Sequence, residues 1–157
     1  AHKEGDNTDS VFYNDLPQYR EDYAFPEIEA EYNALFDARD DVMKALEIAR
    51  ADKLIGKSLD AKVTVYTADK AVLELLAKFT EEELKTVFIT SGAHIVEGAA
   101  PEGAYVPEEG KIAVLVENAD GERCDRCWCY STEGETTTDD EGNEGFICRR
   151  CAAIIAE

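Results

Sequence analysis

Two Cys-x-x-Cys pairs constrain the fold of this chain more than any other feature. The first pair is Cys124 and Cys127, and the second is Cys148 and Cys151. Each such turn directs two thiolates toward one point, and two turns together complete a tetrahedral site of four sulfurs. Four cysteine ligands leave no coordination position open for water, so the spacing predicts one structural Zn²⁺ ion rather than a catalytic metal.

All five cysteines lie between residues 124 and 151, and the preceding sequence has none. A disulfide-stapled secreted domain spreads its cysteines along the whole chain. An odd number in one cluster instead indicates metal binding in a reducing compartment, so we expect a cytoplasmic protein. An iron–sulfur cluster or a redox dithiol is the alternative use of such pairs. Cys129 lies one residue beyond a predicted ligand, and its spacing favours a free thiol.

The segment between the two pairs, residues 131–145, is polar, acidic and contains glycine, as a surface hairpin over a metal site should. So short a module buries too little apolar surface to fold without help. A structural zinc site supplies the missing free energy, roughly 10 kcal/mol or more. The sequence therefore predicts a small zinc finger.

The charge of the chain argues against broad binding of nucleic acid. Sixteen lysines and arginines against 35 acidic residues give a net charge of −19, whereas nucleic-acid binders usually carry a basic surface. This excludes tight, autonomous RNA binding but allows one local contact within a larger assembly. We also expect no membrane association, because no apolar run is long enough to span a bilayer.

Four side chains around the cysteines each have two interpretations. Arg126, Arg149 and Arg150 either offset the −2 charge of a zinc tetrathiolate or form one basic spot on an acidic surface. Trp128 either fills a very small core or offers an exposed indole on which an unpaired RNA base stacks. The residues alone favour charge balance for the arginines and a core position for Trp128.

Before the cysteines, the patterns predict an α+β fold. Residues 1–25 read as an extended lead-in that carries aromatic side chains. Residues 26–117 read as a long helix plus a small mixed α/β unit with a short sheet, and residues 118–157 as the four-cysteine zinc finger. The long helix is expected from Pro26 to Ile55, with Gly56 placed to end it. The α/β unit is expected to have strands at 61–67 and 111–117, a helix within 69–79, and a short helical turn near 81–85.

Three passages together resemble bacterial isoleucyl-tRNA synthetases. The knuckle Glu122-Arg-Cys-Asp-Arg-Cys-Trp-Cys-Tyr130, followed by Cys148-Arg-Arg-Cys151, is similar to the zinc-bearing C-terminal end of that family. The passage Ala49-Arg-x-x-Lys-x-Ile-Gly-x-Ser-Leu59 resembles the end of its long helix, and Thr8–Pro17 resembles a passage further upstream. The resemblance covers nearly all of the chain.

The resemblance implies a parent enzyme that attaches isoleucine to its tRNA with ATP. The HIGH and KMSKS signatures of its catalytic domain are absent. We therefore expect no catalytic residue and no use of ATP in this chain, which reads as the end of the anticodon-binding region plus the zinc finger. Its expected partners are the anticodon end of the isoleucine tRNA and the remaining domains of the parent, and we expect a monomer.

The resemblance also bears on individual residues. It makes the four paired cysteines the zinc ligands, and it favours Arg126 and Trp128 as contacts to the first anticodon base. Together with the basic spot described above, this gives four predicted RNA-binding residues: Arg126, Trp128, Arg149 and Arg150.

Three other functions compete with this one. The first is a structural or protein-docking module, in which zinc staples the chain against its parent without touching RNA. The second is the tail of a DNA-repair glycosylase, which ends in a related finger but carries a basic hairpin where this spacer is acidic. The third, a redox dithiol, requires one cysteine pair to be free of metal.

Overall fold

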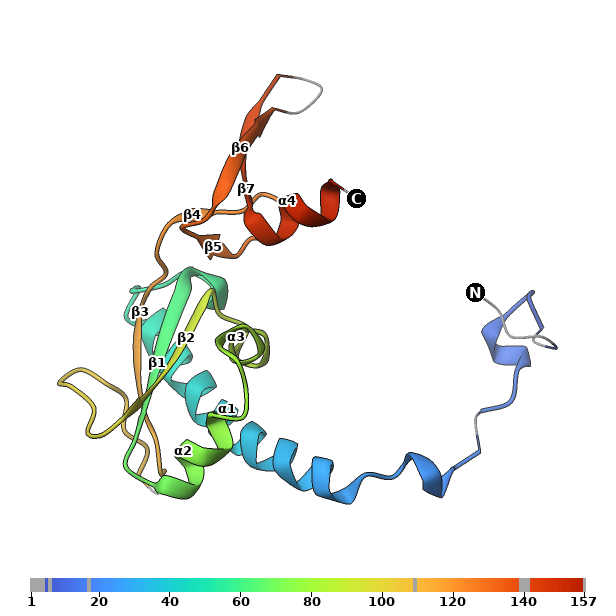
Figure 1. Ribbon diagram of the computed structural model, residues 1–157, viewed down its shortest axis with the longest axis horizontal. Coiled ribbons are helices and arrows are strands. Elements are labelled where there is room, and N and C mark those ends of the chain that lie inside the picture. The colour runs from blue at the N-terminus through green and yellow to red at the C-terminus, as the bar shows by residue number, and fades with distance from the viewer. Residues whose placement is uncertain (1–4, 6, 17, 109, 139–141, 157) are drawn as a thin grey trace.

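The computed structural model describes residues 5, 7–16, 18–108, 110–138 and 142–156. Parts of the predicted lead-in and of the acidic spacer therefore lie outside the described residues. The predicted α+β fold is confirmed: a long helix, a three-stranded sheet with two short helices, and a cysteine-bearing module follow one another along the chain (Figure 1). Within the described part of the chain, no helix combines the length and apolar character needed to cross a membrane.

Helix α1 (Pro26–Ala51) is the longest element. Pro26 lies in its first turn, where the missing N–H has no helical partner to lose. Its C-terminal two thirds bury an apolar stripe at helical spacing against the sheet and α3, as the periodicity predicts. The buried residues of this stripe are Leu35, Ala38, Val42, Ala45, Leu46 and Ala49.

The predicted end of this helix is wrong. The helix ends at Ala51, and Lys53 takes a left-handed φ of 63°. The Leu54 N–H donates to the Ala49 carbonyl at 2.9 Å and the Lys53 N–H to the Arg50 carbonyl at 3.1 Å, which is a Schellman cap. Glycine is the usual residue at the left-handed position. Because this chain has Lys53 there, the sequence pattern did not indicate where the helix ends.

The N-terminal part of α1 extends beyond the α/β unit (Figure 1). Its apolar side chains Ile28, Tyr32 and Phe36 continue the helical spacing of the buried residues but are exposed. The described lead-in before it contains only two 3₁₀ turns, η1 (Val11–Tyr13) and η2 (Glu21–Tyr23). Helical spacing thus identified an apolar face of which only the C-terminal portion belongs to the core.

The sheet is centred on β1 (Ala61–Thr67), which follows the 3₁₀ turn η3 (Ser58–Asp60). It pairs in parallel with β2 (Gly92–Glu97) and antiparallel with β3 (Ala113–Asn118). Every second residue of β1 is buried, so one face of this strand points into the core. The β1 start and the β3 end lie at the edge of the sheet that faces the cysteine-bearing module (Figure 1).

Two helices connect β1 to β2: α2 (Lys70–Leu76) and α3 (Glu81–Phe88). The short helical turn predicted near 81–85 is in fact longer, because Leu84 and Phe88 lie one turn apart and both enter the core. Ile89 then takes a left-handed φ of 56° and ends α3. The core of this unit is a single cluster that joins α1, the sheet and both helices.

The cysteine-bearing module, residues 121–156, follows β3. It contains a short hairpin of β4 (Glu122–Arg123) and β5 (Tyr130–Ser131), a longer hairpin of β6 (Gly134–Thr138) and β7 (Glu144–Cys148), and helix α4 (Arg149–Ile155). The β6–β7 hairpin formed by the acidic spacer projects away from the α/β unit (Figure 1).

Candidate metal centre

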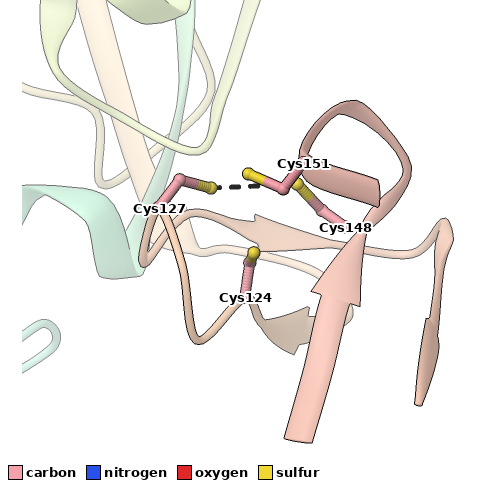
Figure 2. Close-up of side chains that lie close together, drawn as sticks. All are labelled: Cys124, Cys127, Cys148 and Cys151. Carbon is pink, nitrogen blue, oxygen red and sulfur yellow. Dashed lines mark hydrogen bonds between the residues drawn. The ribbon is translucent and has the colours of Figure 1, made fainter. Parts of the chain in front are cut away.

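The first cysteine pair lies in a tight turn between β4 and β5. The Trp128 N–H donates to the Cys124 carbonyl at 2.8 Å, and the Cys124 N–H donates to the Cys129 carbonyl at 2.9 Å. These bonds fold the loop back on itself, so the side chains of Cys124 and Cys127 point to the same side (Figure 2). A further bond, from the Asp125 N–H to the Phe146 carbonyl at 2.9 Å, joins this turn to β7.

The second pair lies where β7 passes into α4. Cys148 is the last residue of β7 and the N-cap of α4, and Cys151 lies in the first turn of that helix. The change from strand to helix brings both thiols to one side of the backbone. Since β7 is tied to the first turn through Phe146, the two pairs face each other.

The four sulfurs converge on one point (Figure 2). All four Sγ atoms lie within 4.8 Å of one another, and the Cys127 and Cys148 sulfurs are 3.8 Å apart. A tetrahedral metal with Zn–S bonds of about 2.3 Å holds its sulfurs about 3.8 Å apart. Cys124, Cys148 and Cys151 are buried, and all are free thiols rather than disulfides. The cluster therefore fits a metal ion of the size and preference of zinc.

The electrostatics of the cluster also favour a bound cation. Burial raises the pKa of the Cys124 thiol, but backbone N–H donors from Cys148, Cys127 and Arg126 outweigh it and bring that pKa to about 6. Burial together with the neighbouring thiols raises the pKa of Cys148 to about 12. Four adjacent thiols cannot all ionise without a positive charge among them, and a divalent cation supplies that charge.

Cys129 lies outside this cluster, as its spacing indicated. It is half-buried, and the described cysteines that converge do not include it. Burial raises the pKa of the Cys129 thiol, which disfavours the thiolate. Its contribution to the site is its backbone carbonyl, which accepts the Cys124 N–H.

The four predicted RNA-binding residues fall into two groups. Arg126 and Trp128 are exposed, and Arg126 forms no ion pair with any described residue. Arg149, in contrast, pairs with Glu133 at 3.2 Å, and the neighbouring Cys127 thiol raises the pKa of Arg150. Trp128 is 58% exposed, so the interpretation of this side chain as a core residue is wrong.

Sequence reasoning missed two residues that hold the module against the α/β unit. The Ser91 hydroxyl donates to the Leu59 carbonyl at 2.6 Å and accepts the Tyr130 N–H at 2.8 Å. The Lys57 ammonium lies 5.6 Å from the centre of the Trp128 ring. Both interactions join segments far apart in sequence, so no local pattern pointed to them.

Replacing Ser91 by alanine is expected to destabilise the junction between the two units by about 1–3 kcal/mol, because the Tyr130 N–H and the Leu59 carbonyl both lose a buried partner. Urea unfolding followed by the fluorescence of the single tryptophan measures the change. Thr132→Ala, which removes an exposed hydroxyl from the same module, is the matched control and should cost less than about 0.5 kcal/mol. Equal effects for the two variants would contradict the assigned role of Ser91.

Comparison with known proteins gives a consistent result over nearly the whole chain. The isoleucine–tRNA ligase of Caldanaerobacter subterraneus subsp. tengcongensis is 42% identical over 99% of this chain. That of Kosmotoga olearia is 39% identical over 95% of it, and that of Bacillus cereus 39% over 98%. The chain spans only 15–16% of the length of these curated relatives. No family model matches the chain.

Proposed function

Because the chain belongs to the isoleucine–tRNA ligase family, we propose that it is the C-terminal tRNA-recognition region of such an enzyme. In this proposal the parent ligates isoleucine to its tRNA with ATP, and this region contacts the anticodon end without taking part in the chemistry. Residues 26–117 are then part of the anticodon-binding region and residues 118–157 are its zinc finger. The remaining domains of the parent are its other partner.

The metal in this proposal is one structural Zn²⁺ ion held by Cys124, Cys127, Cys148 and Cys151. The convergence of four sulfurs, three of them buried, supports this assignment. A cation bound there stabilises all four thiolates and fixes the turn that presents Trp128. The metal acts on RNA only through that turn, because a four-sulfur site has no open position for a ligand.

The conformation of Trp128 is the observation that carries the RNA contact. Its φ of 66° lies in the left-handed region, where a bulky residue costs on the order of 1 kcal/mol relative to glycine. Its side chain is 58% exposed, so burial within the described chain offsets little of that cost. An indole kept at a strained, exposed position fits a stacking surface for an unpaired base.

Arg126 supplies the complementary polar contact in this proposal. Its exposed guanidinium has no acidic partner among the described residues and lies two positions from Trp128, so it is free to donate to a base edge or a phosphate. RNA contacts by Arg149 and Arg150 stay predictions. Their present partners, Glu133 and the Cys127 sulfur, favour a role in charge balance.

The decisive experiment compares two stem-loops that differ only in the anticodon. The zinc-loaded chain is titrated at low salt into fluorescein-labelled isoleucine anticodon stem-loop, and into a copy with a changed anticodon. We expect the unsubstituted chain to prefer the first. Trp128→Ala should weaken that binding about 10- to 100-fold, since a stacked base contributes about 1–3 kcal/mol. It should also abolish the preference, because the stacked indole holds the base where Arg126 can contact its edge.

Phe25→Ala is the matched control, because Phe25 is an aromatic side chain that is 59% exposed but far from the cysteines in sequence. It should leave affinity and preference unchanged. A flat titration by the unsubstituted chain with both stem-loops would instead favour the structural or protein-docking module. The emission of the single tryptophan gives a second readout, since base stacking quenches it.

A further inference from the structure

A cavity of about 490 Å³ lies between the C-terminal end of α1 and the linker from β3 to β4. Arg50 and Lys53 line it on the helix side, and Asn118 and Ala119 on the linker side. Tyr130, two residues after Trp128, closes one wall. The cavity therefore lies at the junction of the α/β unit and the cysteine-bearing module.

The charged side chains that line this cavity are mainly basic, although the chain as a whole is acidic. Arg50, Lys53 and Lys57 are exposed, and none of the three forms an ion pair with a described residue, although the chain carries 35 acidic residues. Asp60 is the one acidic residue among the described lining residues. Its carboxylate already accepts the backbone N–H groups of Gly56 at 3.1 Å and Lys57 at 2.8 Å. A surplus of positive charge is left for a ligand.

The backbone conformation of Lys53 is a second observation at this site. Lys53 occupies the left-handed position of the Schellman cap, where glycine is the usual residue. The dipole of α1 favours Arg50 and Lys53 near its C-terminal end, but it does not account for Lys57, which lies beyond the cap. The Lys57 ammonium instead lies 5.6 Å from the centre of the Trp128 ring. The three cations thus extend from the cavity to the indole.

We propose that this cavity is a phosphate-binding site for the RNA strand whose base stacks on Trp128. Arg50, Lys53 and Lys57 would neutralise backbone phosphate groups next to the stacked nucleotide. The cavity is far larger than the roughly 30 Å³ that one water occupies in the liquid, so a phosphate group with its hydration fits. This proposal rests on the proposed function, because it concerns the same RNA. In this proposal the cavity contributes affinity for RNA, and the turn of residues 122–130 contributes the preference for particular bases.

The test uses the full zinc-loaded chain with Arg50→Gln and Lys53→Gln combined, because these two cations line the cavity and neither is the one that lies over the Trp128 ring. The same two stem-loops are titrated at several salt concentrations. Both stem-loops should bind more weakly by a similar factor. The slope of log K against log [salt] should fall by about 0.7 for each single-strand phosphate that the variant no longer neutralises. The preference for the isoleucine anticodon should persist, because phosphate contacts carry no base information.

Lys70→Gln is the matched control. Lys70 is exposed, forms no ion pair with a described residue, and begins α2 at the opposite end of β1. If the double variant matches this control in affinity and slope while Trp128→Ala still abolishes preference, the phosphate site is wrong and the proposed function stands. Loss of the anticodon preference with an unchanged slope would also overturn the phosphate site, since Arg50 and Lys53 would then contact bases. Absence of binding by the unsubstituted chain overturns both proposals.

Discussion

Removing the metal with a strong chelator should unfold residues 121–156 and leave the α/β unit folded. The core of the cysteine-bearing module is very small: its buried residues are Cys124, Cys148 and Cys151, with Cys127, Phe146 and Ile147 packed against them. Such a core cannot fold by apolar burial alone, and structural zinc contributes roughly 10–16 kcal/mol at neutral pH in comparable small modules. Residue-resolved amide exchange should show that protection disappears in the module and persists in β1.

Two serine substitutions separate the metal ligands from other cysteines. Cys124→Ser should reduce bound zinc well below one ion per chain and reproduce the effect of the chelator, because a buried ligand is removed from a site of four sulfurs. Cys129→Ser should keep one zinc ion and a folded module, because Cys129 lies outside the cluster and acts through its backbone carbonyl. Native mass spectrometry gives the stoichiometry. Equal loss of metal in both variants would show that the ligand set is wrong.

The metal centre could be predicted because the two cysteines of each pair lie close together in the sequence. Cys124 and Cys127 reach one point because a Cys-x-x-Cys turn brings them there, and that turn is a property of consecutive residues. Ser91 is different, because it joins Leu59 to Tyr130, and its neighbours give no hint of either partner. The cavity beside Lys53 is also non-local, since a helix end and a strand linker form it together.

The fold was likewise predictable where a local sequence pattern determines it, and not where distant segments must meet. Helical periodicity located the buried stripe of α1 from Leu35 to Ala49, but it could not show that Ile28 and Tyr32 would be exposed. Periodicity states which face of a helix is apolar and says nothing about what covers that face. The end of the helix was missed for a different reason. Sequence rules expect glycine at the left-handed cap, and this chain places Lys53 there.

Phe88→Ala is expected to destabilise the α/β unit by about 3–5 kcal/mol, the usual cost of deleting a buried phenyl ring. Phe88 is fully buried, is among the largest side chains in that state, and belongs to the core cluster that joins α1 with the sheet. A loss of this size is a large share of the stability of a small domain. Urea unfolding followed by far-ultraviolet circular dichroism measures it.

Ile89→Gly is the matched control for this substitution. Ile89 is adjacent to Phe88 but is 49% exposed and takes a left-handed φ of 56°, so glycine there should be neutral or stabilising. Both variants should retain one zinc ion, because every predicted ligand comes from residues 124–151 and none from the core that Phe88 fills. The chelator and Phe88→Ala would then unfold different parts of one chain. Loss of zinc on Phe88→Ala would contradict this, and would mean that the finger folds only on an intact α/β unit.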